Sequence, residues 1–260
     1  MCKTDELLLT SSEFRVQNFK LKIIYIKIEC LMKYCVVLFV LVLFSCGNEK
    51  SVQLPEISQA QIHEVTDVSP AYIFYNESEK DSVELNSKNL IISTNWLVNA
   101  DKRLTLRQII PSILILQEKK RDAKMHKNKA AKNYFSCNDT SIKNLGFIDF
   151  TDVIYHNGID ADIVESQGIY ETLPSETSNH VLSILFKSKD SITINSSHTS
   201  KNEFINRLEY MDSKQNKIMG IVYLKFNENL TFQDYITYKS MLSKIKLKHA
   251  TISDDEYIFN

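Results

Sequence analysis

The chain has 260 residues, with 31 basic and 32 acidic side chains and a formal net charge of −1. This balance lacks the excess of positive charge with which a general nucleic-acid-binding protein contacts phosphates. The low content of Gly (5) and Pro (4) argues against collagen-like and low-complexity classes, and the 43% of hydrophobic residues favours a packed core.

The stretch from Met32 to Cys46 predicts where the protein is located. It starts with one basic residue, Lys33, continues with an apolar run that carries no charge, and ends in Leu-Phe-Ser-Cys-Gly at positions 43–47. A basic start, an apolar core of roughly 7–15 residues and small residues at a cleavage site are typical of a secretory signal peptide. The closing residues resemble the lipobox of bacterial lipoproteins. This resemblance implies cleavage between Ser45 and Cys46 and lipidation of Cys46, so residues 32–45 are the expected lipoprotein signal peptide.

A retained membrane helix is the alternative interpretation of this stretch. The uncharged run from Tyr34 to Ser45 would span about 18 Å as a helix, whereas the hydrocarbon core of a bilayer is roughly 30 Å thick. Lys27 and Glu29 interrupt the apolar residues upstream, and charges are costly inside a membrane. We favour the lipoprotein because lipidation gives Cys46 a role and because multiple acyl chains anchor a protein stably.

The segments on either side of the signal peptide have separate interpretations. A signal core normally begins close to the first Met, so residues 1–31 are expected to be a mis-assigned extension or a disordered leader, with Met32 as the true start. Residues 46–70 are polar and contain Pro55 and Pro70. This composition favours a tether that separates the fold from the membrane.

Residues 71–175 are expected to form a first α+β unit. Apolar or alternating runs predict strands at 71–75, 82–85 and 91–98. From Leu106 to Lys120, apolar residues recur at helical spacing, and Thr105 is a suitable N-cap. Pro111 either starts this helix in its first turn or kinks it.

A basic run, KKRDAKMHKNKAAK, covers residues 119–132. One interpretation is a contact with an anionic partner, such as lipid headgroups or a cell-wall polymer. The other is the solvated end of the preceding helix, where cations lie near the negative end of the helix dipole. The second interpretation is favoured.

Residues 176–260 give the clearest pattern. Strands are expected at 181–186, 191–194, 217–226 and 249–259. Thr199 or Ser200 can cap one helix, and Thr231 can cap a second. The resulting ββαβαβ order predicts a small mixed sheet with both helices on one face, so the fold class is α+β.

This order and its local sequences resemble the periplasmic domain of the ExbD/TolR family. Four stretches carry the resemblance: 184–204, 221–236, 252–259 and the Leu-Pro segment at 52–56. The resemblance implies a periplasmic domain that binds other envelope proteins or peptidoglycan. Family members also have a membrane helix with an Asp that takes part in proton-driven energy coupling. The apolar run at 34–44 contains no acid, so the motor function is not carried over.

Short internal matches raise a second possibility, that residues 71–175 and 176–260 are two related units. A helix-sized insertion in the second unit would be needed to align them, and matches this short leave the repeat open. The matching pairs are 81–85 with 190–194, 87–89 with 200–202, and 104–108 with 230–234.

The sequence contains no recognisable catalytic set. No His or Cys residues occur at metal-ligand spacing, and the motifs of nucleophilic or nucleotide-binding enzymes are absent. Acid pairs at 149/152, 160/162 and 254/255 are explained better by solvated turns than by acid–base catalysis. Cys137 has no disulfide partner once Cys46 is lipidated, which favours a buried apolar role. We therefore predict no enzyme activity, no catalytic or metal-binding residue and no cofactor.

The sequence thus predicts a lipid-anchored, non-catalytic protein of the bacterial cell envelope, with its globular part facing the periplasm or the surface. Its partners would be the membrane, through the lipid on Cys46, and an envelope protein or peptidoglycan, but no nucleic acid. The alternative is an inner-membrane ExbD-like biopolymer transport subunit with a retained N-terminal helix. A hydrolase with scattered site residues is the third and weakest hypothesis.

Overall fold

The computed structural model describes residues 22, 25, 27–29, 31–34, 50–125, 128–159, 181–214 and 220–260. The chain divides into two compact units, Met1–Lys50 and Ser51–Asn260. In the first unit, the described residues between 22 and 34 are helical and exposed. Within the described ranges, no helix is long and apolar enough to cross a membrane. The predicted cleavage and lipidation site at Ser45 and Cys46 lies outside them.

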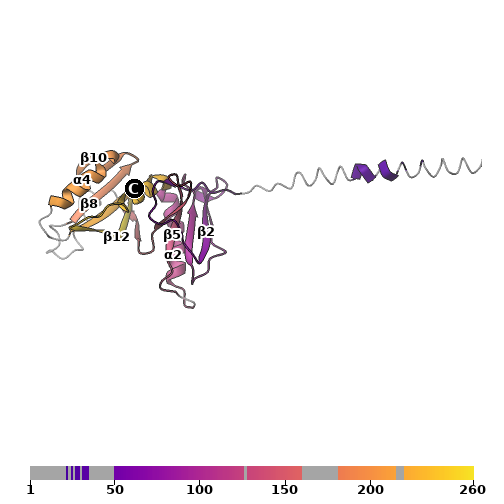
Figure 1. Cartoon of the computed structure of the whole chain (residues 1–260), viewed down its shortest axis with the longest axis horizontal. Coiled ribbons are helices and arrows are strands. Elements are labelled where there is room, and N and C mark those ends of the chain that lie inside the picture. The colour runs from indigo at the N-terminus through magenta and orange to yellow at the C-terminus, as the bar shows by residue number, and fades with distance from the viewer. Residues whose placement is uncertain are drawn as a thin grey trace, which may run out of the picture. The chain divides into compact units, whose positions relative to one another are not determined.

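The unit Ser51–Asn260 has the predicted α+β architecture, built on two mixed sheets of six strands (Figure 1). The first sheet has the order β1-β5-β4-β2-β3, with β6 paired to β5. Its strands are β1 (Glu56–Ile57), β2 (Val68–Tyr75), β3 (Val83–Asn86), β4 (Asn95–Ala100), β5 (Asn133–Asp139) and β6 (Asn144–Asp149), with a 3₁₀ turn η1 (Lys80–Ser82) before β3.

The second sheet has the order β10-β9-β8-β11-β12-β7. Its strands are β7 (Ile154–Ile159), β8 (Val181–Ser188), β9 (Ser191–Ile194), β10 (Ser197–Ser200), β11 (Gly220–Asn227) and β12 (Ala250–Phe259). The longer helices are α2 (Leu106–Arg121), α4 (Lys201–Lys214) and α5 (Phe232–Leu242). The predicted ββαβαβ order is confirmed, with β10 as an additional short strand before α4.

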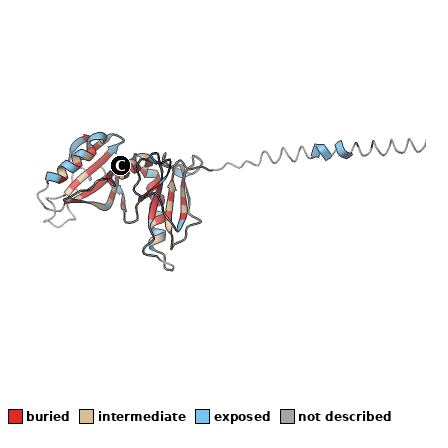
Figure 2. Ribbon diagram, viewed as in Figure 1, coloured by how far each residue is buried: buried red, intermediate tan, exposed pale blue. Residues whose placement is uncertain are grey.

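Helices α4 and α5 lie on the same face of the second sheet, as predicted. Phe186 of β8 contacts Phe204 of α4, with ring centroids 5.6 Å apart, and Tyr238 of α5, with centroids 4.3 Å apart. Helix α5 also reaches the first sheet, because Tyr235 contacts both Phe135 of β5 and Phe226 of β11. Residues of both sheets therefore belong to one continuous hydrophobic core, and Figure 2 shows buried residues along the strands of each sheet.

The three predicted helix starts are confirmed, and Ser200 directly precedes α4. Thr105 precedes α2 and forms a capping box with Gln108, and Thr231 does the same with Asp234 before α5. A capping box satisfies backbone N–H groups that have no partner within the helix. Pro111 lies inside α2, which runs on to Arg121.

The predicted tether over residues 46–70 differs from the structure. Pro55 O accepts from Asn138 N at 2.8 Å, and the carboxylate of Asp139 accepts from the backbone N–H groups of Gln59 and Ala60. Residues 53–62, which we call the strap, therefore dock on the unit. The apolar residues Pro55 and Ile57 of the strap are buried, whereas its polar side chains remain exposed to solvent.

The predicted boundary near residue 175 also differs from the structure. Strand β7 precedes that boundary in the chain but pairs in parallel with β12 in the second sheet. Residues before the predicted boundary therefore contribute a strand to the second sheet, and Ser51–Asn260 forms one compact unit.

The two sheets nevertheless share a common plan. In the first, the hairpin β2–β3 is followed by β4 beside β2, then α2, then β5 beside β4. In the second, the hairpin β8–β9 is followed by β11 beside β8, then α5, then β12 beside β11. Helix α4 is inserted between β9 and β11, where the sequence alignment of the two halves required a helix-sized insertion.

Reciprocal hydrogen bonds join the halves at the two capped helix starts. Leu106 N donates to Leu230 O, and Phe232 N donates to Leu104 O. One residue further along each helix, Arg107 N donates to Glu228 O and Gln233 N donates to Lys102 O. The segments that match at 104–108 and 230–234 are thus the segments that bind each other.

Candidate functional site

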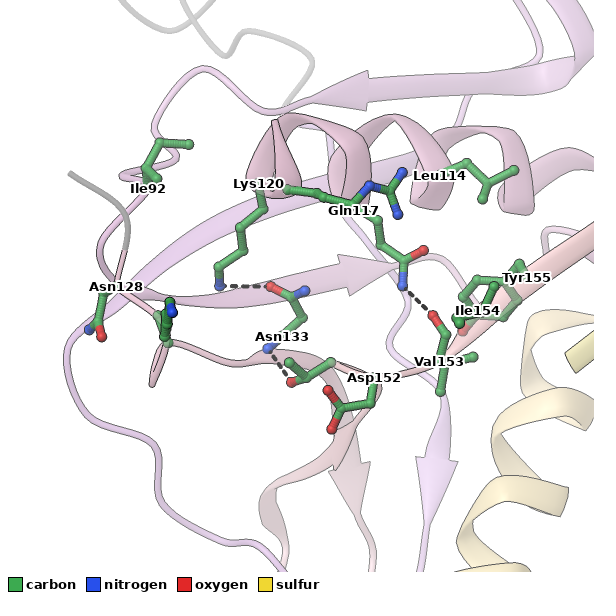
Figure 3. Close-up of a pocket in the computed structure, with 14 residues that line it drawn as sticks. Ile92, Leu114, Gln117, Lys120, Asn128, Asn133, Asp152, Val153, Ile154 and Tyr155 are labelled. Atoms are coloured by element: carbon green, nitrogen blue, oxygen red, sulfur yellow. Dashed lines mark hydrogen bonds between the residues drawn. The ribbon is translucent and has the colours of Figure 1, made fainter. Parts of the chain in front are cut away.

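The main candidate site is a cavity of about 510 Å³ at the C-terminal end of α2 (Figure 3). Its other walls are the loop before β4, the segment 128–133 leading into β5, and the segment 151–155 leading into β7. The volume falls in the range of roughly 300–1,000 Å³ that is usual for small-ligand sites. The structure thus brings together four segments of the chain, from Ile92 to Tyr155.

One side of the cavity is apolar. Leu114 projects from α2, Ile92 lies in the loop before β4, and Val153, Ile154 and Tyr155 come from the start of β7. Ile154 is 53% exposed, so its side chain is accessible to a ligand. This wall offers van der Waals contact to an apolar group.

Lys120 forms the inner part of the cationic side. It lies in the last turn of α2, and its ammonium donates to Asn133 Oδ1 at 2.8 Å, to Lys132 O at 3.0 Å and to Thr94 O at 3.3 Å. The Nζ atom lies 4.9 Å from the centroid of the Trp96 ring. Burial lowers the pKa of Lys120 to about 8, although Asp149 opposes this shift. Lys120 thus joins α2 to β4 and β5.

Arg121 and Lys129 add two more cations to the lining, and Asp152 is its one acid. The Arg121 side chain is 65% exposed, with Nε 4.0 Å from Asp122 Oδ1. The excess of positive charge in the lining and its apolar wall suit a ligand that has both an anionic and an apolar part. Lys119, Lys120 and Arg121 do occupy the last turn of α2, as the helix-dipole interpretation of the basic run predicted.

Hydrogen bonds hold the walls of the cavity in place. Gln117 Nε2 donates to Val153 O at 2.9 Å, which fixes α2 against the start of β7. Asn133 N donates to Thr151 Oγ1 at 2.9 Å, which fixes the start of β5 against the same segment. The cavity is therefore formed before any ligand binds.

A buried chain of polar groups begins at the cavity wall. The hydroxyls of Tyr155 and Tyr235 are 2.9 Å apart, Tyr235 donates to Glu256 Oε2 at 2.8 Å, and Lys239 pairs with Glu256 Oε1. Burial raises the pKa values of Tyr155 and Tyr235 well above the ordinary value, and nearby Glu256 adds to the effect. Both tyrosines therefore stay neutral and act as hydrogen-bond donors.

Lys239 is also part of the wall of a second, smaller cavity of about 230 Å³. This cavity lies at the C-terminal end of α5, with Ser240, Leu242 and Ser243 among its lining residues, and the strap contributes Ile57 and residues 60–62. Aligning α2 and α5 on Thr105 and Thr231 places Leu114 opposite Ser240 and Gln117 opposite Ser243. The two cavities thus lie at corresponding ends of corresponding helices.

The acid pairs that the sequence assigned to turns have structural partners where they are described. Asp149 accepts from Lys132 Nζ at 2.8 Å and from Thr151 N at 2.9 Å; burial opposes these bonds, but the pKa of Asp149 is lowered overall. The pair at 160/162 lies outside the described residues.

Asp255 of the third pair lies 2.7 Å from His156 Nε2 and accepts weakly from Ser253 Oγ at 3.3 Å. The carboxylate, not the imidazole, is the middle group of this set. A Ser-His-Asp triad requires the imidazole in the middle, so the arrangement does not activate a nucleophile. The described residues contain no group of three or more His, Cys, Asp or Glu side chains that could hold a metal ion.

Cys137 is buried, as predicted, and its thiol contacts Phe135 O. Burial raises the pKa of the thiol, which makes it unreactive as a thiolate. Sequence reasoning found the basic run beside the main cavity but missed the apolar wall, because Ile92 and residues 153–155 have no local pattern that relates them to α2.

Comparisons with known proteins give no relative. No protein-family model matches the chain, and no curated protein or solved structure is detectably similar to it. The ExbD/TolR resemblance and the lipidation of Cys46 therefore remain predictions.

Proposed function

We propose that the protein is a lipid-anchored binding protein of the bacterial cell envelope and that its unit Ser51–Asn260 recognises an envelope partner at the main cavity. The observation that carries the proposal is this cavity, which combines an apolar wall, a cationic side and hydrogen-bonded walls in one open site of about 510 Å³. A cavity of this size with both apolar and polar lining residues can bind a ligand without any catalytic group.

The anchor supports the same function. Cleavage before Cys46 would leave only a few residues between the lipid and the strap, which docks from Gln53 onward. The unit Ser51–Asn260 would therefore be held close to the membrane. The buried acids support a binding role too, because Asp101, Asp139, Asp212 and Glu256 are each held by hydrogen bonds within the fold.

Metabolic labelling with [³H]palmitate tests the anchor. We expect the wild-type chain to be labelled and Cys46→Ala to lose the label, with sensitivity of processing to globomycin. Labelling that survives Cys46→Ala would contradict the lipobox. Absence of label in both chains would favour the inner-membrane subunit with a retained helix.

Site-specific photo-crosslinking in intact cells tests the binding site. A photoreactive residue replaces Ile154, which lines the cavity, or Ile115, which lies on α2 outside it. The two positions are matched in exposure, at 53% and 54%. We expect a defined crosslinked product from position 154 alone. The same products from both positions, or none from either, would contradict recognition at the cavity.

A further inference from the structure

The lining of the main cavity also indicates which chemical class of ligand it binds. We propose that the main cavity binds the C-terminal end of a polypeptide, with the terminal carboxylate at the cationic side and an apolar last side chain against the Leu114–Tyr155 wall. This inference rests on the proposed function and names the part of the partner that enters the site.

Charge complementarity places the carboxylate. The described lining contains three cations, Lys120, Arg121 and Lys129, against one acid, Asp152. The three N–H groups of Lys120 already donate within the fold, so Arg121 and Lys129 would donate to the carboxylate. Hydrogen bonds from cations to a carboxylate are about twice as strong as neutral ones. Capture of a terminal carboxylate is an established mode of peptide recognition.

The side-chain amides of Gln117 and Asn133 favour a ligand that contains a peptide bond over one that has only an acyl chain. Gln117 uses its NH₂ group on Val153 O, and Asn133 uses its Oδ1 on Lys120. The Gln117 carbonyl then faces the cavity as an acceptor and the Asn133 NH₂ as a donor, between α2 and the start of β7 (Figure 3). A peptide group has one N–H donor and one C=O acceptor, which matches this pair.

The molecule itself contains a peptide segment at the corresponding place in its other half. The strap lies against the C-terminal end of α5, where Gln61 Nε2 donates to Ser243 O and Lys244 Nζ donates to Ser58 O. Ser243 corresponds to Gln117 in the alignment of the two helices. The C-terminal end of α5, which corresponds to the cavity end of α2, thus already binds a segment of polypeptide chain.

Binding of short peptides to the full chain, held in phosphatidylcholine nanodiscs, tests the inference. The probe is Ac-Gly-Ser-Gly-Ser-Ala-Val with a free carboxylate, and its controls end in Val-amide, in Glu or in D-Val. Trp96 is the only tryptophan and lies under Lys120, so its fluorescence reports occupancy, with calorimetry as a second measurement. We expect saturable binding of the Val carboxylate peptide and roughly tenfold weaker binding of its amide.

Charge reversals locate the carboxylate. Arg121→Glu and Lys129→Glu should each weaken binding roughly tenfold. Lys124→Glu is the control, because it changes the net charge equally in the same basic segment but lies outside the lining.

Equal losses of affinity in all three variants would show only long-range attraction and overturn the site. Equal binding of the amide would overturn carboxylate recognition, and preference for the D-Val peptide would overturn a polypeptide terminus in favour of a cell-wall peptide. If no peptide binds while position 154 still crosslinks to a partner, the inference fails but the proposed function stands.

Discussion

Glu256 shows how a single buried charge is stabilised in this fold. Its side chain is almost entirely buried, and its carboxylate is held by Tyr235 and Lys239. A buried ion is tolerated when its lone pairs are satisfied, and removal of one partner leaves a desolvation cost that nothing offsets. The polar chain between α5, β7 and β12 therefore depends on each of its members.

Tyr235→Phe tests this dependence. The variant loses the donor to Glu256 and the contact with the Tyr155 hydroxyl, so we expect the free energy of unfolding to fall by about 1–3 kcal/mol in urea titrations. Tyr238→Phe is the control, because the Tyr238 ring is buried in the same core but its hydroxyl donates to the backbone oxygens of two exposed residues, Ser188 and Lys189. A loss in Tyr238→Phe as large as in Tyr235→Phe would contradict a special role for the Glu256 contact.

Lys120 gives a prediction about pH. Its pKa is about 8 in the fold and about 10.4 in an unfolded chain. Between these values the unfolded chain binds more protons, so the contribution of Lys120 to stability rises with pH and is constant below about pH 7. We expect the stability of the wild type relative to Lys120→Met to increase from pH 8 to pH 10, measured by urea unfolding at each pH. Lys119→Met is the control, and a flat difference for Lys120→Met would contradict the shifted pKa.

At the scale of elements, the docking of the strap depends on one glycine. A Cβ atom added at Gly146 on β6 would lie 2.5 Å from Ala60 Cβ and 3.2 Å from Ile57 Cδ1. Such distances are far below van der Waals contact, so the strap must move if the side chain grows. The close approach of strap and β6 explains why Gly occupies this position.

Gly146→Ala should therefore destabilise the protein by about 1–3 kcal/mol and increase hydrogen exchange at the amide of Ala60. Combining it with Ala60→Gly removes the atom that clashes, so we expect most of the protection to return in the double variant. Failure of this rescue would show that Gly146 is needed for another reason, such as its own backbone conformation.

The elements that the sequence predicted well are those with a strong local pattern. Helix α2 has apolar residues at helical spacing after Thr105, and β8 and β9 alternate on either side of a short turn. The strap and β7 were not predicted, because the partners that order them, Asp139 and β12, lie far away in the chain. The cavity was predicted only in its basic part for the same reason.

For the whole molecule, the shared core predicts one cooperative unfolding transition. Strand β7 pairs in the second sheet, and Tyr235 packs against both sheets. Neither half can unfold without exposing apolar surface of the other, so a two-state transition is expected. Fluorescence of Trp96 in β4 and far-UV circular dichroism should give the same urea midpoint, and hydrogen exchange in β8 and β11 the same free energy. Two separate midpoints would contradict this coupling.

The reciprocal bonds at Thr105 and Thr231 have a consequence in terms of symmetry. Each helix start donates to the segment from which it accepts, which is the defining property of an isologous contact between two copies of one protein. A polypeptide with a single half would carry a self-complementary surface and could associate with a second copy of itself about a two-fold axis. The present chain thus has the organisation of a homodimer joined into one polypeptide. The strap lines the smaller of the two corresponding cavities, and no strap segment lines the larger one.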